Sequence, residues 1–76
     1  MNKIRRKAIE EIGDQLERLY ERLEQIRDEE QEYIDNMPES LQGCEKAEKA
    51  EFRVSRLEEA ASSLNELYVS INEAAV

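Results

Sequence analysis

Two 3-4 repeats of apolar residues, one in each half of the chain, constrain the fold of this sequence more than any other feature. Apolar residues at alternating steps of three and four lie along one face of an α-helix. A strand does not use this spacing, because its alternate side chains point to opposite faces. Only Glu30 interrupts the repeats, which run through Ile9, Ile12, Leu16, Leu19, Leu23, Ile26, Glu30, Tyr33 and Met37, and through Ala47, Ala50, Val54, Leu57, Ala61, Leu64, Tyr68, Ile71 and Ala75.

A single break separates the two repeats. Pro38 disfavours helical geometry in the residue before it, so the first helix should end just upstream. Pro38 is itself suited to open a short helical turn that reaches Leu41. Gly43 is then expected to free the backbone for a reversal. We therefore expect one domain over residues 1–76, with a helix over about 3–36, a turn over 37–43 and a helix over about 44–75.

The two repeats match each other when the chain folds back at this break. If the numbers of paired residues sum to 80, every position of the first repeat from Ile9 to Tyr33 meets a position of the second. Ile26 then meets Val54, and Glu30 meets Ala50. The expected fold class is all-α, a two-helix antiparallel coiled-coil hairpin.

Chain length and composition point to self-association of this hairpin. A core of 76 residues rarely supplies more than about 3–5 kcal/mol without a disulfide, a metal or a partner copy. One cysteine and no histidine exclude an intrachain disulfide and the Cys/His spacings of zinc sites. The second repeat is also wider than one partner helix needs. We expect two hairpins to form a dimer, a four-helix bundle, through Ala8, Ala60, Leu67 and Ala74.

Charge is strongly acidic overall and segregated along the hairpin. The net charge of −8 argues against direct nucleic-acid binding and favours solubility. The turn end is acidic, and it is interpreted either as a solvated face or as a mimic of nucleic-acid charge. The opposite end carries Lys3, Arg5, Arg6 and Lys7. These cations either neutralise Glu66, Glu73 and the C-terminal carboxylate, or contact an anionic ligand such as a nucleotide.

Features of an enzyme or of an exported protein are missing from the sequence. Without histidine the commonest general base is absent, and no nucleophile has a base at a plausible spacing. We expect no catalytic residue, no cofactor and no metal. No apolar run approaches the ~20 residues that cross a bilayer, and no apolar segment follows the basic start. The expected localisation is cytoplasmic, without membrane contact.

Two further residues stand outside the apolar repeats. Phe52 has Arg53 and Arg56 as neighbours, and an exposed aromatic ring beside arginine is a typical partner contact. We therefore expect Phe52 to contact a partner or the second copy. Cys44 lies at the expected start of the second helix, where sequence assigns it no role.

The region around the break also carries a family resemblance. It reads Glu-Glu-Gln-Glu-Tyr-Ile-Asp-Asn-Met-Pro-Glu-Ser-Leu-Gln-Gly over residues 29–43, and Glu-Lys-Ala-Glu-Lys-Ala over residues 45–50. This segment resembles a group of small uncharacterised helical proteins encoded by bacteriophages and prophage-bearing gut bacteria. The resemblance implies a hairpin and a phage or mobile-element context, and it implies no activity. Cys44 departs from the group's pattern, in which a small polar residue such as Ser caps the helix.

Three classes of function fit these observations. The first is a small non-enzymatic interaction module, a phage or prophage accessory protein that binds a host or phage protein in the host cytoplasm. The second is an oligomeric binder that sequesters an anionic nucleotide through the basic end. The third is an acidic nucleic-acid mimic or a purely structural coiled-coil clamp.

Overall fold

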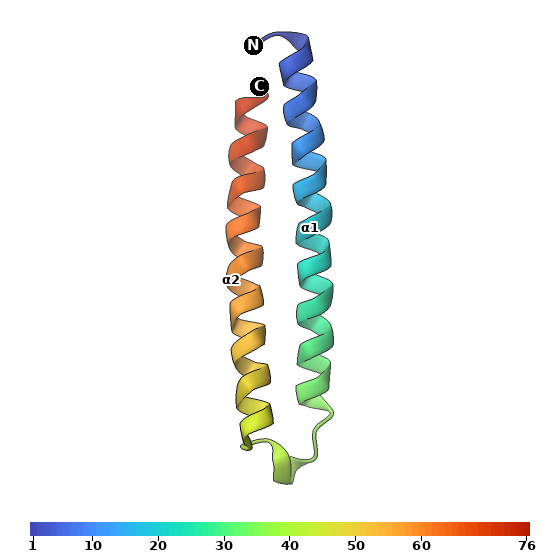
Figure 1. The fold of residues 1–76 in the computed structure, drawn as a ribbon, viewed down its shortest axis with the longest axis vertical. Coiled ribbons are helices and arrows are strands. Elements are labelled where there is room, and N and C mark those ends of the chain that lie inside the picture. Colours follow the sequence, from blue (N-terminus) through green and yellow to red (C-terminus); the bar gives the residue numbers. More distant parts are fainter.

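A computed structural model describes all 76 residues and confirms the antiparallel helical hairpin (Figure 1). Helix α1 (Lys3–Asp35) and helix α2 (Glu45–Ala74) are joined by the short 3₁₀ helix η1 (Glu39–Leu41). The Asn2 side chain caps α1 by accepting a hydrogen bond of 2.8 Å from the backbone N–H of Arg5. Both chain termini lie at one end of the molecule, and the turn lies at the other.

The turn is built differently from the sequence-based prediction. Gly43 does not have a positive φ angle, so the reversal does not depend on its conformational freedom, and that prediction was wrong. Pro38 and Cys44 instead supply the change of direction through extended backbone, with ψ angles of 143° and 168°. The side-chain amide of Gln42 donates to the carbonyl oxygens of Ile34 and Met37, both at 3.1 Å. Gln42 therefore fastens η1 to the end of α1.

The helix faces that meet were predicted correctly for α2 and only in part for α1. On α2 the residues turned toward α1 are those of the predicted repeat, and Ala47, Ala50, Val54 and Ala61 are buried. On α1 the positions Ile12, Leu19, Ile26 and Tyr33 were expected in the same contact, yet they are 44–48% exposed. The residues one position further along the chain are buried or half-buried in their place, namely Gly13, Tyr20, Arg27 and Ile34.

The pairing register also differs from the predicted one. Glu30 pairs with Arg53 across the two helices, at 3.2 Å between Oε1 and Nη1. Ile34, not Glu30, shares a buried cluster with Ala50. Paired numbers therefore sum to about 84 instead of 80, a shift of about one helical turn. The small side chains of α2 explain this shift, because Ala50 leaves space that a branched apolar residue fills better than a carboxylate.

The helices approach each other closely near Gly13. A Cβ atom at this position would lie 3.0 Å from Oδ1 of Asn72 and 3.9 Å from Cγ2 of Ile71. Gly13 is buried although it has no side chain. The missing side chain therefore gives Asn72 and Ile71 room against α1, at the cost of about 1 kcal/mol in helix propensity.

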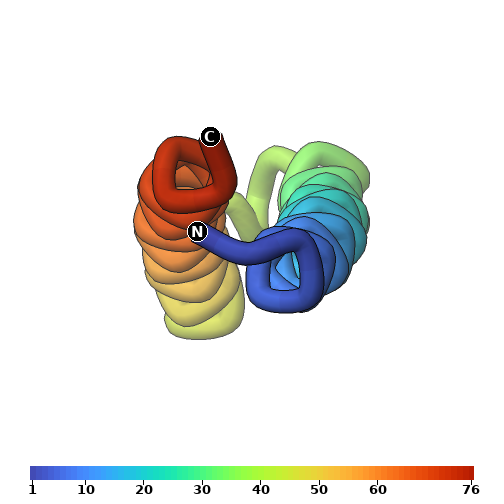
Figure 2. The backbone as a smooth tube through the Cα atoms, turned by 90° about the horizontal axis from the view of Figure 1, so that it is seen from above, coloured from blue at the N-terminus to red at the C-terminus, as the bar shows by residue number.

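The core is small, and the molecule exposes more surface than a compact protein of its size. Only six of the 76 residues are buried. The solvent-accessible surface is 5977 Å², against about 4,800 Å² for a compact monomer of this mass. Seen end-on, the helices form a single layer with nothing over either broad face (Figure 2). This fold therefore leaves both broad faces of the hairpin open.

Candidate interaction surface

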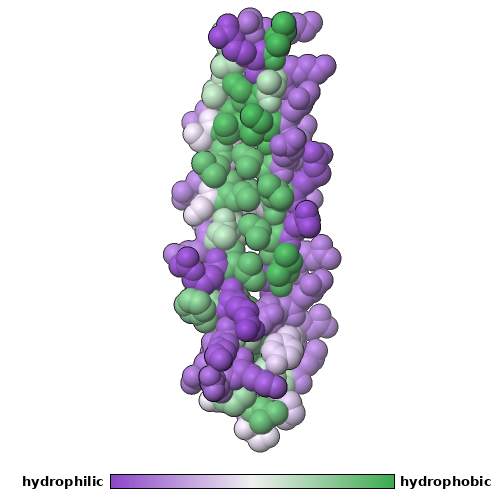
Figure 3. Space-filling model, viewed as in Figure 1, coloured by the Kyte–Doolittle hydropathy of each residue, from purple (hydrophilic) through white to green (hydrophobic).

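One broad face of the hairpin is apolar along most of its length. Figure 3 shows a continuous hydrophobic band over the line between α1 and α2, starting at the terminal end. We call the concave part of this band the apolar groove. Its apolar lining consists of Leu19, Leu23 and Ile26 of α1 and of Leu57 and Leu64 of α2, and the side chains of Arg22 and Arg56 also line it. Ile12 and Ile71 continue the same rows at seven-residue spacing toward the termini.

Polar side chains close the apolar groove toward the turn. The Glu30–Arg53 ion pair crosses from one helix to the other at this point. The Glu30 side chain is 25% exposed, so its carboxylate is paired and partly hydrated rather than isolated in a core. Arg27 of α1 pairs with Asp28 on its own helix, at 2.8 Å. The apolar groove therefore has a defined polar boundary.

The residues predicted to contact a partner are all exposed. Leu67 is 57% exposed, and Ala8, Ala60 and Ala74 are also open to solvent. Leu67 follows Leu64 by three residues, so it extends the same side of α2 beyond the apolar groove. Phe52 is 65% exposed, and its ring lies beside Ile26 and Leu57 at the polar boundary. Sequence reasoning did not assign Ile12, Leu19 and Ile26 to this surface, because it placed them between the helices.

The opposite broad face is polar. A shallow groove there is lined mainly by charged and amide side chains, with Tyr20 and Tyr68 among them. Hydrogen bonding to Glu24 and the negative charge of that carboxylate raise the pKa of Tyr20 above its ordinary value. A phenol with a raised pKa holds its proton more firmly at neutral pH, so Tyr20 is poorly suited to act as a general base. The two broad faces of the hairpin therefore differ sharply in polarity.

The four cations of the terminal end are exposed and make no ion pair. Lys3, Arg5, Arg6 and Lys7 form no salt bridge within 4.0 Å, so none of them pairs directly with Glu66 or Glu73. Arg6 only donates a long hydrogen bond, 3.4 Å, to the carbonyl oxygen of Met1. The cations lie within five residues of one helix and therefore point in several directions. They offer positive charge without a formed pocket.

The acidic turn end is also largely unpaired. Residues 28–53 contain nine acidic and three basic side chains. Glu30 and Arg53 pair across the helices, and Lys49 pairs with Glu45 at 3.0 Å on α2. Glu32, Glu48 and Glu51 form no salt bridge and are exposed. This end of the molecule is therefore a net negative surface.

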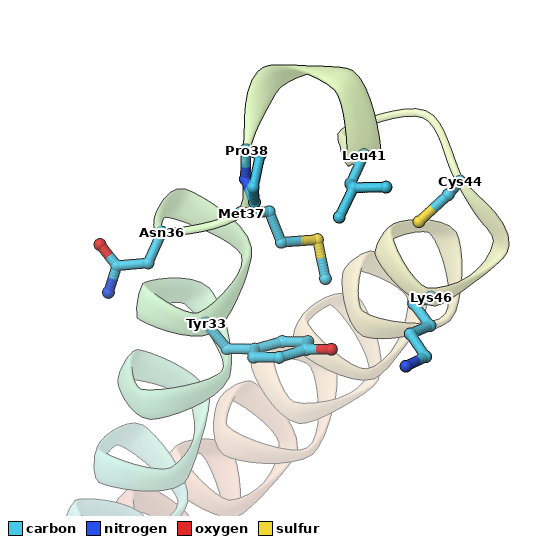
Figure 4. A pocket seen from close by; sticks show the side chains of 7 residues that line it. All are labelled: Tyr33, Asn36, Met37, Pro38, Leu41, Cys44 and Lys46. Atoms are coloured by element: carbon cyan, nitrogen blue, oxygen red, sulfur yellow. The ribbon is translucent and has the colours of Figure 1, made fainter.

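A small pocket of about 390 Å³ lies inside the turn (Figure 4). The Tyr33 ring reaches across from α1, and the Met37 thioether and the Leu41 side chain lie over it. The Cys44 thiol points toward the same pocket from the start of α2. Cys44 is a half-buried free cysteine that occupies the N-cap position without making a side-chain capping hydrogen bond. The pocket is therefore a packing feature of the turn with a thiol on its wall.

Replacing Cys44 by Ser is expected to stabilise the hairpin by about 1 kcal/mol, because a serine hydroxyl at an N-cap accepts a hydrogen bond from the first turn of a helix. The backbone of Cys44 already has the required extended geometry. Thermal unfolding followed by circular dichroism at a fixed concentration measures the effect. Cys44→Ala is the matched control, since it removes the thiol without adding a cap. A lower melting temperature for the serine variant than for the alanine variant would contradict this account.

No group of three or more cysteine or acidic side chains is placed to hold a metal ion. Neither helix has a stretch long and apolar enough to cross a bilayer. Comparison with protein-family models, curated proteins and solved structures finds no significant match.

Proposed function

We propose that the hairpin is a small non-enzymatic interaction module that functions as a two-fold dimer, a four-helix bundle. The observation that carries this proposal is the exposed apolar groove with its continuation through Ile12, Leu67 and Ile71. Continuous apolar surface on one face of a small protein is typical of an interaction site. Two copies that pack groove against groove remove it from water and give each helix a second neighbour.

The exposure of Ile12, Leu19 and Ile26, which were predicted to lie between the helices, supports the same arrangement. In a four-helix bundle each helix contacts two neighbours, so its apolar band has to be wider than a hairpin alone requires. Residues such as Gly13 and Ile34 then serve the contact within the hairpin, while Ile12, Leu19 and Ile26 serve the contact with the second copy. A purely intrachain hairpin has no physical reason to keep the outward-facing row of Ile12, Leu19 and Ile26 apolar.

The size of the face also fits a stable dimer. The hairpin measures 60 × 14 × 12 Å along its principal axes. One broad face, its polar turn end included, therefore has a projected area of roughly 800 Å² per copy, which is comparable to the ~800 Å² that each partner buries in a standard-size protein interface. A second copy is the occupant that matches the length of the groove without requiring any other chain.

Within this proposal the protein is a phage or prophage accessory protein that binds a host or phage protein. This part rests on the resemblance of the turn region to small phage-encoded helical proteins. In the proposed dimer the apolar groove is covered, so the partner contacts the charged ends and outer helix faces. Binding through charged surface predicts an association that weakens as salt rises.

A second candidate function is the binding of an anionic ligand at the terminal end. The observation that favours it is that Lys3, Arg5, Arg6 and Lys7 are exposed and unpaired. Titration of the wild-type protein and of an Arg5→Gln, Arg6→Gln, Lys7→Gln variant with a nucleoside triphosphate, followed by calorimetry, tests it. Equal heats from both proteins would remove this candidate.

Sedimentation equilibrium of the wild-type protein at micromolar concentration tests the dimer. The expected mass is twice the chain mass of 8.9 kDa, with a melting temperature that rises with concentration. A single species at the chain mass, with a melting temperature independent of concentration, would contradict the dimer.

Affinity capture with the wild-type and the triple Gln variant as matched baits then tests whether binding of a protein partner depends on the basic end.

A further inference from the structure

We infer that the two copies of the proposed dimer lie antiparallel, so that the basic terminal end of each copy faces the acidic turn end of the other. This inference rests on the proposed dimer and adds the orientation and the position of the two-fold axis. Two features carry it: the arrangement of the apolar row on α1, and the opposite charges of the two ends of the hairpin.

The row on α1 is symmetric about Leu19. Arg5, Ile12, Leu19, Ile26 and Tyr33 follow one another at seven-residue spacing on one side of the helix. An apolar residue of the same type therefore lies one heptad on either side of Leu19. The apolar groove on α2 centres at the same level, because Leu64 lies beside Leu19. A two-fold axis at Leu19 places Ile12 of one copy level with Ile26 of the second copy, so apolar side chains meet on both sides of the axis.

Charge selects the orientation. Side chains of residues 28–53 sum to −6, while those of residues 1–9 and 70–76 comprise four basic and one acidic group, a sum of +3. A parallel dimer would place two acidic turn ends, each with a side-chain charge of −6, side by side. They would lie within about 10 Å, the distance over which charges interact at moderate salt. The antiparallel arrangement separates the acidic ends by almost the length of the molecule and brings each one beside a positive end. Like charges are thereby kept apart, and unlike charges are brought together.

The two-fold axis at Leu19 also brings together Arg5 and Tyr33, the two ends of the row on α1. With Leu19 on the axis, Arg5 of one copy lies level with Tyr33 of the second copy. Arg5 makes no ion pair within its own chain, and Tyr33 is 48% exposed. An arginine beside an exposed aromatic ring forms a favourable cation–π contact. The Glu30–Arg53 pair that closes the apolar groove then lies level with Ala8 of the second copy, which is small enough to pack beside it.

Distance measurement between spin labels tests the orientation. The variant carries Ser40→Cys and Cys44→Ser, so the single label lies on an exposed residue of η1. About 20 residues separate this level from Leu19, which at 1.5 Å per residue gives a label separation of about 60 Å for the antiparallel dimer and under about 30 Å for a parallel one. A second variant, Ser63→Cys with Cys44→Ser, places the label near the axis and gives a short distance in either orientation.

The outcomes separate the inference from the proposed dimer. A long distance for Ser40→Cys with a short one for Ser63→Cys supports the antiparallel arrangement. Short distances for both variants would overturn the orientation and leave the dimer intact. No dipolar signal from either variant, with sedimentation at the chain mass, would overturn the proposed dimer and the orientation together.

Discussion

Replacing Leu67 by Glu is expected to convert the dimer to a monomer, lowering the association constant by about 100-fold or more. The carboxylate would be moved from water into an apolar interface without a partner. Leu67 is 57% exposed in the single hairpin, so the helices themselves keep their packing. Sedimentation equilibrium of wild type and variant at the same micromolar concentration measures the change.

Ser62→Glu is the matched control for this experiment. It adds the same charge to α2 at an exposed position that the helical periodicity places on the side away from the apolar groove. The control is expected to associate like the wild-type protein. Equal loss of association in both variants would mean that added charge alone, and not its place beside the apolar groove, opposes the dimer.

Replacing Ala50 by Glu is expected to unpack the turn end of the hairpin and destabilise it by about 3 kcal/mol or more. Ala50 has no exposed surface and lies in one cluster with Ile34 and Val54. The longer side chain has to displace α1 or carry its charge into the contact between the helices. Urea unfolding followed by circular dichroism at constant protein concentration measures the free energy of unfolding.

Ser55→Glu serves as the control for Ala50→Glu, because Ser55 is exposed on the same helix. A surface substitution of this kind changes the free energy of unfolding by about 0.5 kcal/mol at most. Ala50→Glu behaving like Ser55→Glu would show that the helices do not pack together at Ala50. It would also speak against the register in which Ile34, not Glu30, faces Ala50.

The sequence predicts the second helix better than the first, and the reason lies in the residues on either side of each repeat. On α2 the neighbours of the repeat on one side are Glu51, Glu58, Asn65 and Asn72, so a rotation of the helix toward that side would bury polar side chains. On α1 the predicted row is Ile12, Leu19 and Ile26, whereas the row that faces α2 is Gly13, Tyr20, Arg27 and Ile34. Periodicity favours the first row because it is the more apolar, and it takes no account of side-chain size or of the fit between the helices.

Register was wrong by one helical turn for a related reason. Charge pairs and apolar matches fit several registers of a long hairpin nearly equally well. The choice depends on local fit, such as the space beside Ala50 and the absence of a side chain at Gly13. The apolar groove was likewise underestimated, because residues thought to lie between the helices are in fact on its surface. The role of Gln42 in fastening the turn has no signal in the spacing of the sequence.

The concentration of buried side chains near the turn has a consequence for how this chain folds. Ile34, Ala47, Ala50 and Val54 are four of the six buried residues, and they are joined by the shortest loop that the hairpin can close. The entropic cost of closing the loop is lowest there. Folding is therefore expected to nucleate at the turn and to proceed toward the termini. The part of the hairpin next to the chain termini then forms last. In native-state hydrogen exchange this order appears as a gradient, with the slowest amides beside the turn and the fastest beside the chain ends.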